Sequence, residues 1–419
     1  MLLIVLTGIL AFYVAWNLGA NDVANSMGTS VGSKAITLRQ ALVIAGILEF
    51  SGAVLFGRQV SQTLATEIVN PNLFAAQPQL LVLGMMAVLM GCGLWLQIAT
   101  SKGWPVSSSH GVVGAIAGFS CIAAGIGAVD WANISRISIT WVLTPLASGI
   151  IAAGFYSIIK YSILDRPNPI DQLREWIPWL SAIVLSIFGV IVLPSIFDTP
   201  LFANLPFPKH DLTIATGGIA AIALTSISWH QLDGGRRQEV RGKLENSSPR
   251  EVEQILARFQ VISACFVAFA HGSNDVGNAI APLAAIVYII NTGSIPLTSF
   301  GVPLWILLLG GCGIVAGLAI WGKKVIATIG ENIIPLQPSS GFCAEIATAT
   351  TVLIASKLGL PVSTSHALVG GVIGIGLIQN WRNVRFSTVK SIALAWVITI
   401  PVSAVLGAAI FVCLRFLFA

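Results

Sequence analysis

Charged residues are scarce in this sequence. Only 9% of its 419 residues are Asp, Glu, Lys or Arg, and 55% are hydrophobic. A soluble protein carries roughly 25% charged residues, so this composition excludes a set of water-soluble domains. Apolar runs long enough for about 30 Å of hydrocarbon recur from end to end, and they are apolar on every face, unlike the strands of an outer-membrane barrel. The composition therefore predicts an all-α, polytopic protein of the lipid bilayer.

A basic face and a cysteine motif are also absent. The 22 Lys and Arg lie between the hydrophobic spans, so the net charge of +5 does not indicate binding to nucleic acid. The six cysteines lie inside apolar segments, and none forms a Cys-x-x-Cys pair. We expect them to be small buried residues rather than metal ligands.

About twelve transmembrane helices fit the hydrophobic pattern. A polar stretch at residues 231–258 is interpreted as a solvated loop joining two halves. If this loop is cytoplasmic, as the positive-inside rule suggests, both termini are extracytoplasmic, in a plasma membrane such as the bacterial inner membrane. The count of twelve treats residues 105–128 and 361–379 as full crossings. If these segments are re-entrant, the argument for this orientation is weaker. The predicted spans are residues 1–20, 36–56, 79–99, 105–128, 138–159, 176–197, 212–229, 257–285, 302–321, 341–357, 361–379 and 391–417.

Two motifs occur twice in the same order. GANDVAN at residues 19–25 returns as GSNDVGN at residues 272–278, and PVSSSH at residues 105–110 returns as PVSTSH at residues 361–366. An odd number of predicted spans separates the copies, so the repeat is inverted. Inverted repeats with interrupted helices are typical of secondary transporters, which bind substrate near the bilayer midplane. The predicted organisation is an N-terminal repeat (1–160), linking spans with a cytoplasmic loop (161–256), and a C-terminal repeat (257–419).

Four acidic residues lie inside the predicted spans or at their edges. Asp22 and Asp275 occupy the same position in the two copies, and Glu49 and Glu345 lie outside the paired motifs. Ionisable residues within a membrane are costly and mark functional sites. Because Gly, Asn and Asp favour caps and turns, we predict that the helix breaks at each aspartate motif. The alternative is that these acids only hold a kink by binding backbone amides.

Three hydroxyl residues follow Pro105 and Pro361. A helix that begins at each proline would present free N–H groups and about half a positive charge, which together form an anion site. The alternative is that the hydroxyls merely cap a buried helix end. Neither motif contains Arg or Lys, so an anion beside Asp22 and Asp275 requires an accompanying cation. Oxygen ligands from Asn, Asp and Ser suit a small hard cation such as sodium.

The chemistry of the aspartates favours phosphate as the anion. Phosphate near neutral pH keeps a proton that it can donate to a carboxylate, whereas sulfate can only accept. Cotransported cations would also offset the inside-negative potential, which opposes anion entry by about 2.3 kcal/mol per charge per 100 mV.

The paired motifs, with Glu49 in LEFSGAVLFG and Glu345 in GFCAEIATA, closely resemble the inorganic phosphate transporter (PiT) family. The resemblance covers residues 1–160 and 257–419. It implies an inverted-repeat carrier that holds phosphate and sodium, or in some members protons, and carriers of sulfate share the motifs. The residues expected to bind phosphate are Asp22, Asn25, Ser108, Ser109, Asp275, Asn278, Thr364 and Ser365, and those expected to bind sodium are Asn21, Asn274, Ser107, Ser363, Glu49 and Glu345.

The sequence thus predicts a sodium-coupled importer of inorganic phosphate, with no resident cofactor and no enzymatic activity. A proton-coupled phosphate or sulfate permease and an anion channel remain as alternatives, and a homodimer stays open. His110 and His366, which follow the hydroxyl residues, could relay protons or serve capping and packing.

Overall fold

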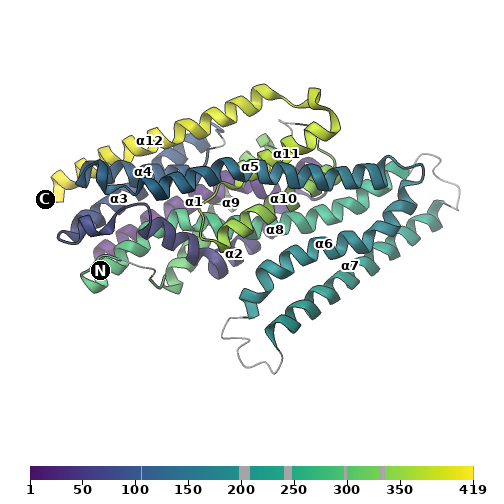
Figure 1. Ribbon diagram of the computed structural model, residues 1–419, viewed down its shortest axis with the longest axis horizontal. Coiled ribbons are helices and arrows are strands. Elements are labelled where there is room, and N and C mark those ends of the chain that lie inside the picture. Colours follow the sequence, from purple (N-terminus) through teal and green to yellow (C-terminus); the bar gives the residue numbers. More distant parts are fainter. Residues whose placement is uncertain are drawn as a thin grey trace.

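The computed structural model describes residues 1–104, 106–197, 208–239, 248–296, 300–329, 334 and 336–418. Within them the chain forms twelve α-helices, and nine of these are long and apolar enough to cross a membrane. Figure 1 shows the helices running along one long axis, with both termini at the same end. The predicted all-α membrane fold is confirmed. The helices are α1 (Leu2–Gly32), α2 (Leu38–Thr66), α3 (Pro78–Ser101), α4 (Ser108–Ala124), α5 (Trp131–Ile159), α6 (Pro169–Phe197), α7 (Lys209–Glu239), α8 (Ser248–Thr292), α9 (Leu304–Ile329), α10 (Pro338–Lys357), α11 (Thr364–Asn380) and α12 (Phe386–Phe418).

The helices of the two halves pack reciprocally. Helix α1 packs on α9, and α8 packs on α2. In the same way α4 packs on α12, and α11 packs on α5. This exchange of partners is the arrangement that two inverted repeats produce around a pseudo-two-fold axis. Helices α6 and α7 pair with each other at the edge of the bundle (Figure 1).

Helices α3 and α4 form a hairpin that begins and ends at one end of the bundle. Val69, before α3, forms a β-bridge with Val129, after α4, and the Asn70 amide donates to the Ala128 carbonyl at 2.8 Å. Helix α4 has 17 residues and is about 25 Å long at 1.5 Å per residue, which is short for a full crossing. The re-entrant alternative for residues 105–128 is therefore the one that this geometry supports.

Helices α10 and α11 form the equivalent hairpin in the second half. Ile334 precedes α10, and its side chain lies against Gly376 in the last turns of α11. Residues 361–379 thus follow the same re-entrant path. A hairpin contributes two membrane crossings if its arms span the bilayer and none if it is re-entrant. The number of crossings between the two aspartate motifs is odd in both cases, so the motifs still run in opposite directions.

The helices do not break at the aspartate motifs, and that prediction is wrong. Helix α1 continues through residues 19–25, and α8 continues through residues 272–278. The polar side chains bind neighbouring helices instead of competing for their own backbone, as Asn21 and Asn274 show below. The glycines serve close packing: Gly19 lies against the backbone of Ile314, and Gly272 lies against the backbone of Glu49.

Two smaller predictions also need correction. The polar stretch at residues 231–258 is not only a loop, because α7 extends to Glu239 and α8 begins at Ser248, and residues 240–247 lie outside the described part of the chain. Of the six cysteines expected to be buried, Cys92 and Cys343 are buried, Cys121 and Cys265 are half-buried, and Cys312 and Cys413 are exposed on the helix surface. Small apolar side chains such as cysteine are expected on the helix surface of a protein that faces lipid.

Candidate substrate and cation site

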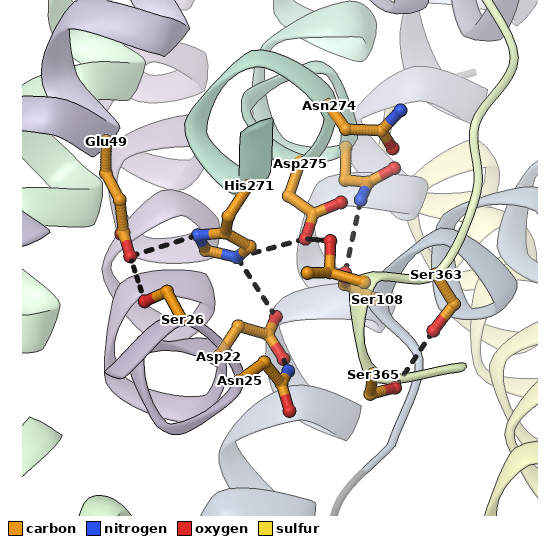
Figure 2. Close-up of polar contacts among 12 residues, drawn as sticks. Asp22, Asn25, Ser26, Glu49, Ser108, His271, Asn274, Asp275, Ser363 and Ser365 are labelled. Carbon is orange, nitrogen blue, oxygen red and sulfur yellow. Dashed lines mark hydrogen bonds and ion pairs between the residues drawn. The ribbon is translucent and has the colours of Figure 1, made fainter. Parts of the chain in front are cut away.

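Three buried carboxylates from three helices surround one histidine. The Nε2 atom of His271 on α8 lies 3.0 Å from Asp275 Oδ2 and 3.9 Å from Asp22 Oδ2 on α1. Its Nδ1 atom lies 3.2 Å from Glu49 Oε1 on α2. Figure 2 shows the ring between these carboxylates, each of which lies within ion-pair distance of a ring nitrogen. All four side chains are buried, so the cluster is shielded from solvent and each charge depends on its neighbours.

His271 is a site residue that the sequence pattern does not predict. It precedes Gly272 in the second copy of the aspartate motif, but Leu18 precedes Gly19 in the first copy, so the repeat does not mark it. Its partner Glu49 is also unmatched, because Ile314 packs on Gly19 as Glu49 packs on Gly272. The available signal was a lone histidine one helical turn before Asp275 in an apolar span.

The starts of α4 and α11 lie beside this cluster and differ slightly from the prediction. Both helices begin three residues after the proline of the motif, at Ser108 and Thr364. Ser107 and Ser363 are their N-caps, and the hydroxyl oxygens accept from the amides of the third helical residue at 3.4 and 3.3 Å. Ser107 and Ser363 therefore cap the two helices, which does not exclude a bound ion on their oxygens, while Pro105 lies outside the described residues.

Side chains of α8 join both helix starts to the carboxylates. Asn278 Nδ2 donates to the hydroxyl oxygens of Ser108 and Ser109, each at 3.1 Å. The Thr364 hydroxyl donates to Asp275 Oδ2 at 3.1 Å. One face of α8 therefore contacts the hydroxyl motifs of both repeats. Figure 2 labels one residue of each contact, Ser108 and Asp275.

The remaining predicted phosphate residues are buried nearby. Asn25 Nδ2 donates to Asp22 Oδ1 at 2.9 Å, one turn away on α1. The hydroxyl groups of Ser365 and Ser363 are 2.9 Å apart (Figure 2). The hydroxyl of Ser109 donates to the Val362 carbonyl at 2.9 Å, which links the tips of the two hairpins.

The two asparagines predicted to bind sodium occupy equivalent positions. Asn21 Nδ2 donates to Thr100 at the end of α3, at 2.8 Å. Asn274 Nδ2 donates to Ser356 at the end of α10, at 3.1 Å, and to the Leu360 carbonyl at 3.0 Å. Each aspartate motif is thereby fastened to the end of the hairpin arm in its own repeat.

Several buried oxygen atoms in this region have no hydrogen-bond partner among the described residues. A buried oxygen of this kind normally accepts a hydrogen bond or binds an ion. Carboxylate and amide oxygens are ligands that sodium accepts, so the donor set fits a cation beside the carboxylates. The unpartnered atoms are Glu49 Oε2, Asn274 Oδ1, Asp275 Oδ1 and Asn278 Oδ1.

Glu345 lies in a separate polar cluster. Its Oε1 accepts from Thr29 and, at 2.7 Å, from Ser30, both on α1. Its Oε2 accepts from Ser263 on α8 at 2.7 Å, and Gln260 donates to Oε1 at 3.3 Å. Thr29 is seven residues beyond Asp22, about 10 Å along the helix. The structure therefore does not bring Glu345 together with the other predicted sodium ligands.

These features define a class of protein. Two inverted repeats, two re-entrant hairpins and a buried cluster of acids beside helix N-termini are the elements of a membrane transport protein with a central binding site. The sequence matches the Phosphate transporter family over residues 18–407. The chain belongs to this family, so it is an integral membrane transporter and not an enzyme.

Known proteins resemble the chain over almost its whole length. The chloroplastic inorganic phosphate transporter 2-1 of Arabidopsis thaliana is 40% identical over 419 residues, which cover 96% of this chain and 70% of that protein. A solved structure described as the sodium-dependent phosphate transporter is 36% identical, with a TM-score of 0.87 and full coverage of both chains. The resemblance to the phosphate transporter family that the motifs indicated is confirmed.

Proposed function

We propose that this protein imports inorganic phosphate by symport with sodium. The observation that carries the proposal is that α8 contacts both hydroxyl motifs while His271 joins Asp275 to Asp22. Residues from opposite repeats thus share one buried site, as alternating access around a fixed site requires. The solved relative described as sodium-dependent supports sodium as the coupling ion.

Phosphate suits this site better than an anion without a proton. The free N–H groups at the starts of α4 and α11, with the hydroxyls of Ser108, Ser109, Thr364 and Ser365, would bind its oxygens. The unpartnered Asp275 Oδ1 can accept the hydrogen bond that a protonated phosphate donates. Sulfate at neutral pH has no such proton, so it would leave two carboxylates facing an anion.

Sodium would neutralise the charge that the anion brings. The proposed ligands near phosphate are oxygens of Asn21, Asn274, Ser107, Ser363 and Glu49. Glu345, with the hydroxyls around it, forms a second cation site about 10 Å further along α1. Two separated sites would allow two sodium ions per phosphate, which carries a net charge of +1 with the monoanion and of zero with the dianion. The inside-negative potential would then favour import of the monoanion and no longer oppose that of the dianion.

We place the protein in a plasma membrane with both termini extracytoplasmic. The location of both termini at one end of the bundle supports termini on one side of the membrane. The basic residues of the polar stretch at residues 231–258 favour a cytoplasmic location for that stretch and hence extracytoplasmic termini.

Uptake of radiolabelled phosphate into proteoliposomes tests the proposal. We expect concentrative uptake with an inward sodium gradient between pH 5.5 and 8.5, and its loss when choline replaces sodium. Unlabelled sulfate in excess should compete weakly. Sodium-independent uptake driven by an acidic exterior would instead establish proton coupling, and downhill flux without any coupling ion would establish a channel.

A further inference from the structure

Two histidines and two tryptophans form a closed cluster where the hairpins meet. The Nδ1 atom of His110, on α4, lies 3.2 Å from the Trp396 carbonyl oxygen on α12. The Nδ1 atom of His366, on α11, lies 3.1 Å from the Trp141 carbonyl oxygen on α5. Each histidine therefore binds the long helix of the other repeat.

The aromatic rings of the same four residues also pack on one another. The His110 ring packs on the Trp141 ring at 4.0 Å between centroids, and the His366 ring packs on the Trp396 ring at 3.6 Å. The two imidazoles meet edge to face at 4.8 Å. Each histidine thus touches both tryptophans, one through a hydrogen bond and the other through its ring.

The hydrogen bonds determine which ring nitrogen carries the proton. A carbonyl oxygen only accepts, so Nδ1 of each histidine must be the N–H donor. The Nε2 atoms of His110 and His366 have no hydrogen-bond partner among the described residues. Within the described part of the chain, the structure shows packing and hydrogen-bonding roles for both histidines, and no hydrogen bond from either ring to a carboxylate.

The cluster also contacts the helix starts that form the proposed anion site. His110 follows Ser108 and Ser109 in the first turn of α4, and His366 follows Thr364 and Ser365 in the first turn of α11. The indole N–H of Trp141 donates to the Pro361 carbonyl at 2.9 Å, at the tip of the second hairpin. The same tryptophan that supports His110 therefore fixes the tip that carries the other hydroxyls.

We propose that His110 and His366 are positioning residues that fasten the two hairpins to each other. Because each histidine is anchored on the opposite repeat, the start of α4 cannot shift without releasing the start of α11. The anion would then meet both helix starts in one fixed arrangement. The inference rests on the proposed phosphate site, whose residues the histidines would position without touching the anion.

A double-mutant cycle on the full-length protein in proteoliposomes tests this linkage. We expect His110→Ala and His366→Ala each to raise the KM for phosphate about tenfold at saturating sodium, with a much smaller change in the sodium requirement. The KM for phosphate of the double variant should be no higher than that of the single variant with the higher KM, because either change alone releases both hairpins. Multiplying effects in the double variant, or an unchanged KM in either single variant, would overturn the proposal.

Conservative variants separate positioning from simple packing. Asparagine places an amide nitrogen near the position of histidine Nδ1, whereas glutamine places it further out. We expect His110→Asn and His366→Asn to recover most of the affinity lost with alanine, and the glutamine variants to recover little. Equal behaviour of Asn and Gln would contradict a role for the Nδ1 hydrogen bond. If the alanine variants fail to fold, the comparison of the asparagine and glutamine variants still tests the proposal. The control is His230→Ala, at an exposed histidine on α7.

Thermal unfolding gives a readout that does not depend on phosphate. The same double-mutant cycle on the melting temperature of the purified protein should show a coupling between His110 and His366 that His230 does not share. Absence of uptake by the unaltered protein would refute the proposed function, while coupling in unfolding would still support the linkage of the hairpins. Additive melting shifts would refute the linkage whatever the protein transports.

Discussion

The Nε2 atom of His271 lies 3.0 Å from Asp275 Oδ2, one helical turn further along α8. The Nδ1 atom of the same ring lies 3.2 Å from Glu49 Oε1, so one histidine connects carboxylates from both halves of the chain. No Lys or Arg among the described residues forms an ion pair in this cluster. His271 is therefore the group that lies within ion-pair distance of all three carboxylates.

This position predicts the behaviour of His271→Ala. Removal of the ring leaves three buried carboxylates without their common partner, and their mutual repulsion should destabilise the bundle. Bound sodium would offset that repulsion. We expect sodium to raise the melting temperature of His271→Ala by more than it raises that of the unaltered protein, with choline as the ionic-strength control. An equal sodium effect on both proteins would show that sodium does not bind beside this cluster.

The two aspartates give a second prediction. Asp22→Asn and Asp275→Asn should each abolish concentrative phosphate uptake, because each removes an acceptor for the phosphate proton and a charge that attracts sodium. Both variants should still insert and fold, since Asn keeps the size of Asp. Asp165→Asn, at an exposed aspartate after α5, is the matched control. Near-normal uptake by either variant would rule out a site shared by the two repeats.

The sequence predicts the two aspartates of this site from the repeat and Glu49 from its place in an apolar span, but not His271. Asp22 and Asp275 stood out because the same polar motif occurs twice in apolar spans. His271 and Glu49 did not form a recognisable pair, because the other repeat has Leu18 and Ile314 in their places. His271 and Glu49 meet because α8 packs on α2, and this helix packing cannot be read from one sequence.

The error about helix breaks has a similar cause. Asn21 and Asn274 have low helix propensity, and the prediction of a break followed from that local preference. Their partners, Thr100 and Ser356, come from hairpins far along the chain. These contacts satisfy the side chains, so tertiary structure overrides the propensity and both helices continue.

The hydroxyl residues at the helix starts give a third prediction. In Ser108→Ala with Ser109→Ala, and in Thr364→Ala with Ser365→Ala, phosphate should bind more weakly. Each hydrogen bond to a charged group contributes roughly 1.5 to 3 kcal/mol, so each lost contact should weaken binding about tenfold or more.

Equilibrium binding of labelled phosphate measures this effect directly. A control double variant is Thr350→Ala with Thr351→Ala on α10, whose hydroxyls donate only to carbonyls of their own helix. Phosphate affinity within twofold of normal in both test variants would place the anion elsewhere.

The last prediction concerns Glu345, whose carboxylate accepts four hydrogen bonds from α1 and α8. In Glu345→Gln, an amide N–H₂ group would replace one acceptor oxygen, and the negative charge that attracts a cation would be lost. Because the cluster lies about 10 Å along α1 from Asp22, the phosphate site itself should be little affected. We therefore expect the sodium concentration for half-maximal uptake to rise several-fold while the KM for phosphate at saturating sodium stays within about twofold. Uptake assays across a sodium series, with the exposed Glu67→Gln as control, measure both quantities, and a selective loss of phosphate affinity would show that Glu345 acts on the anion instead.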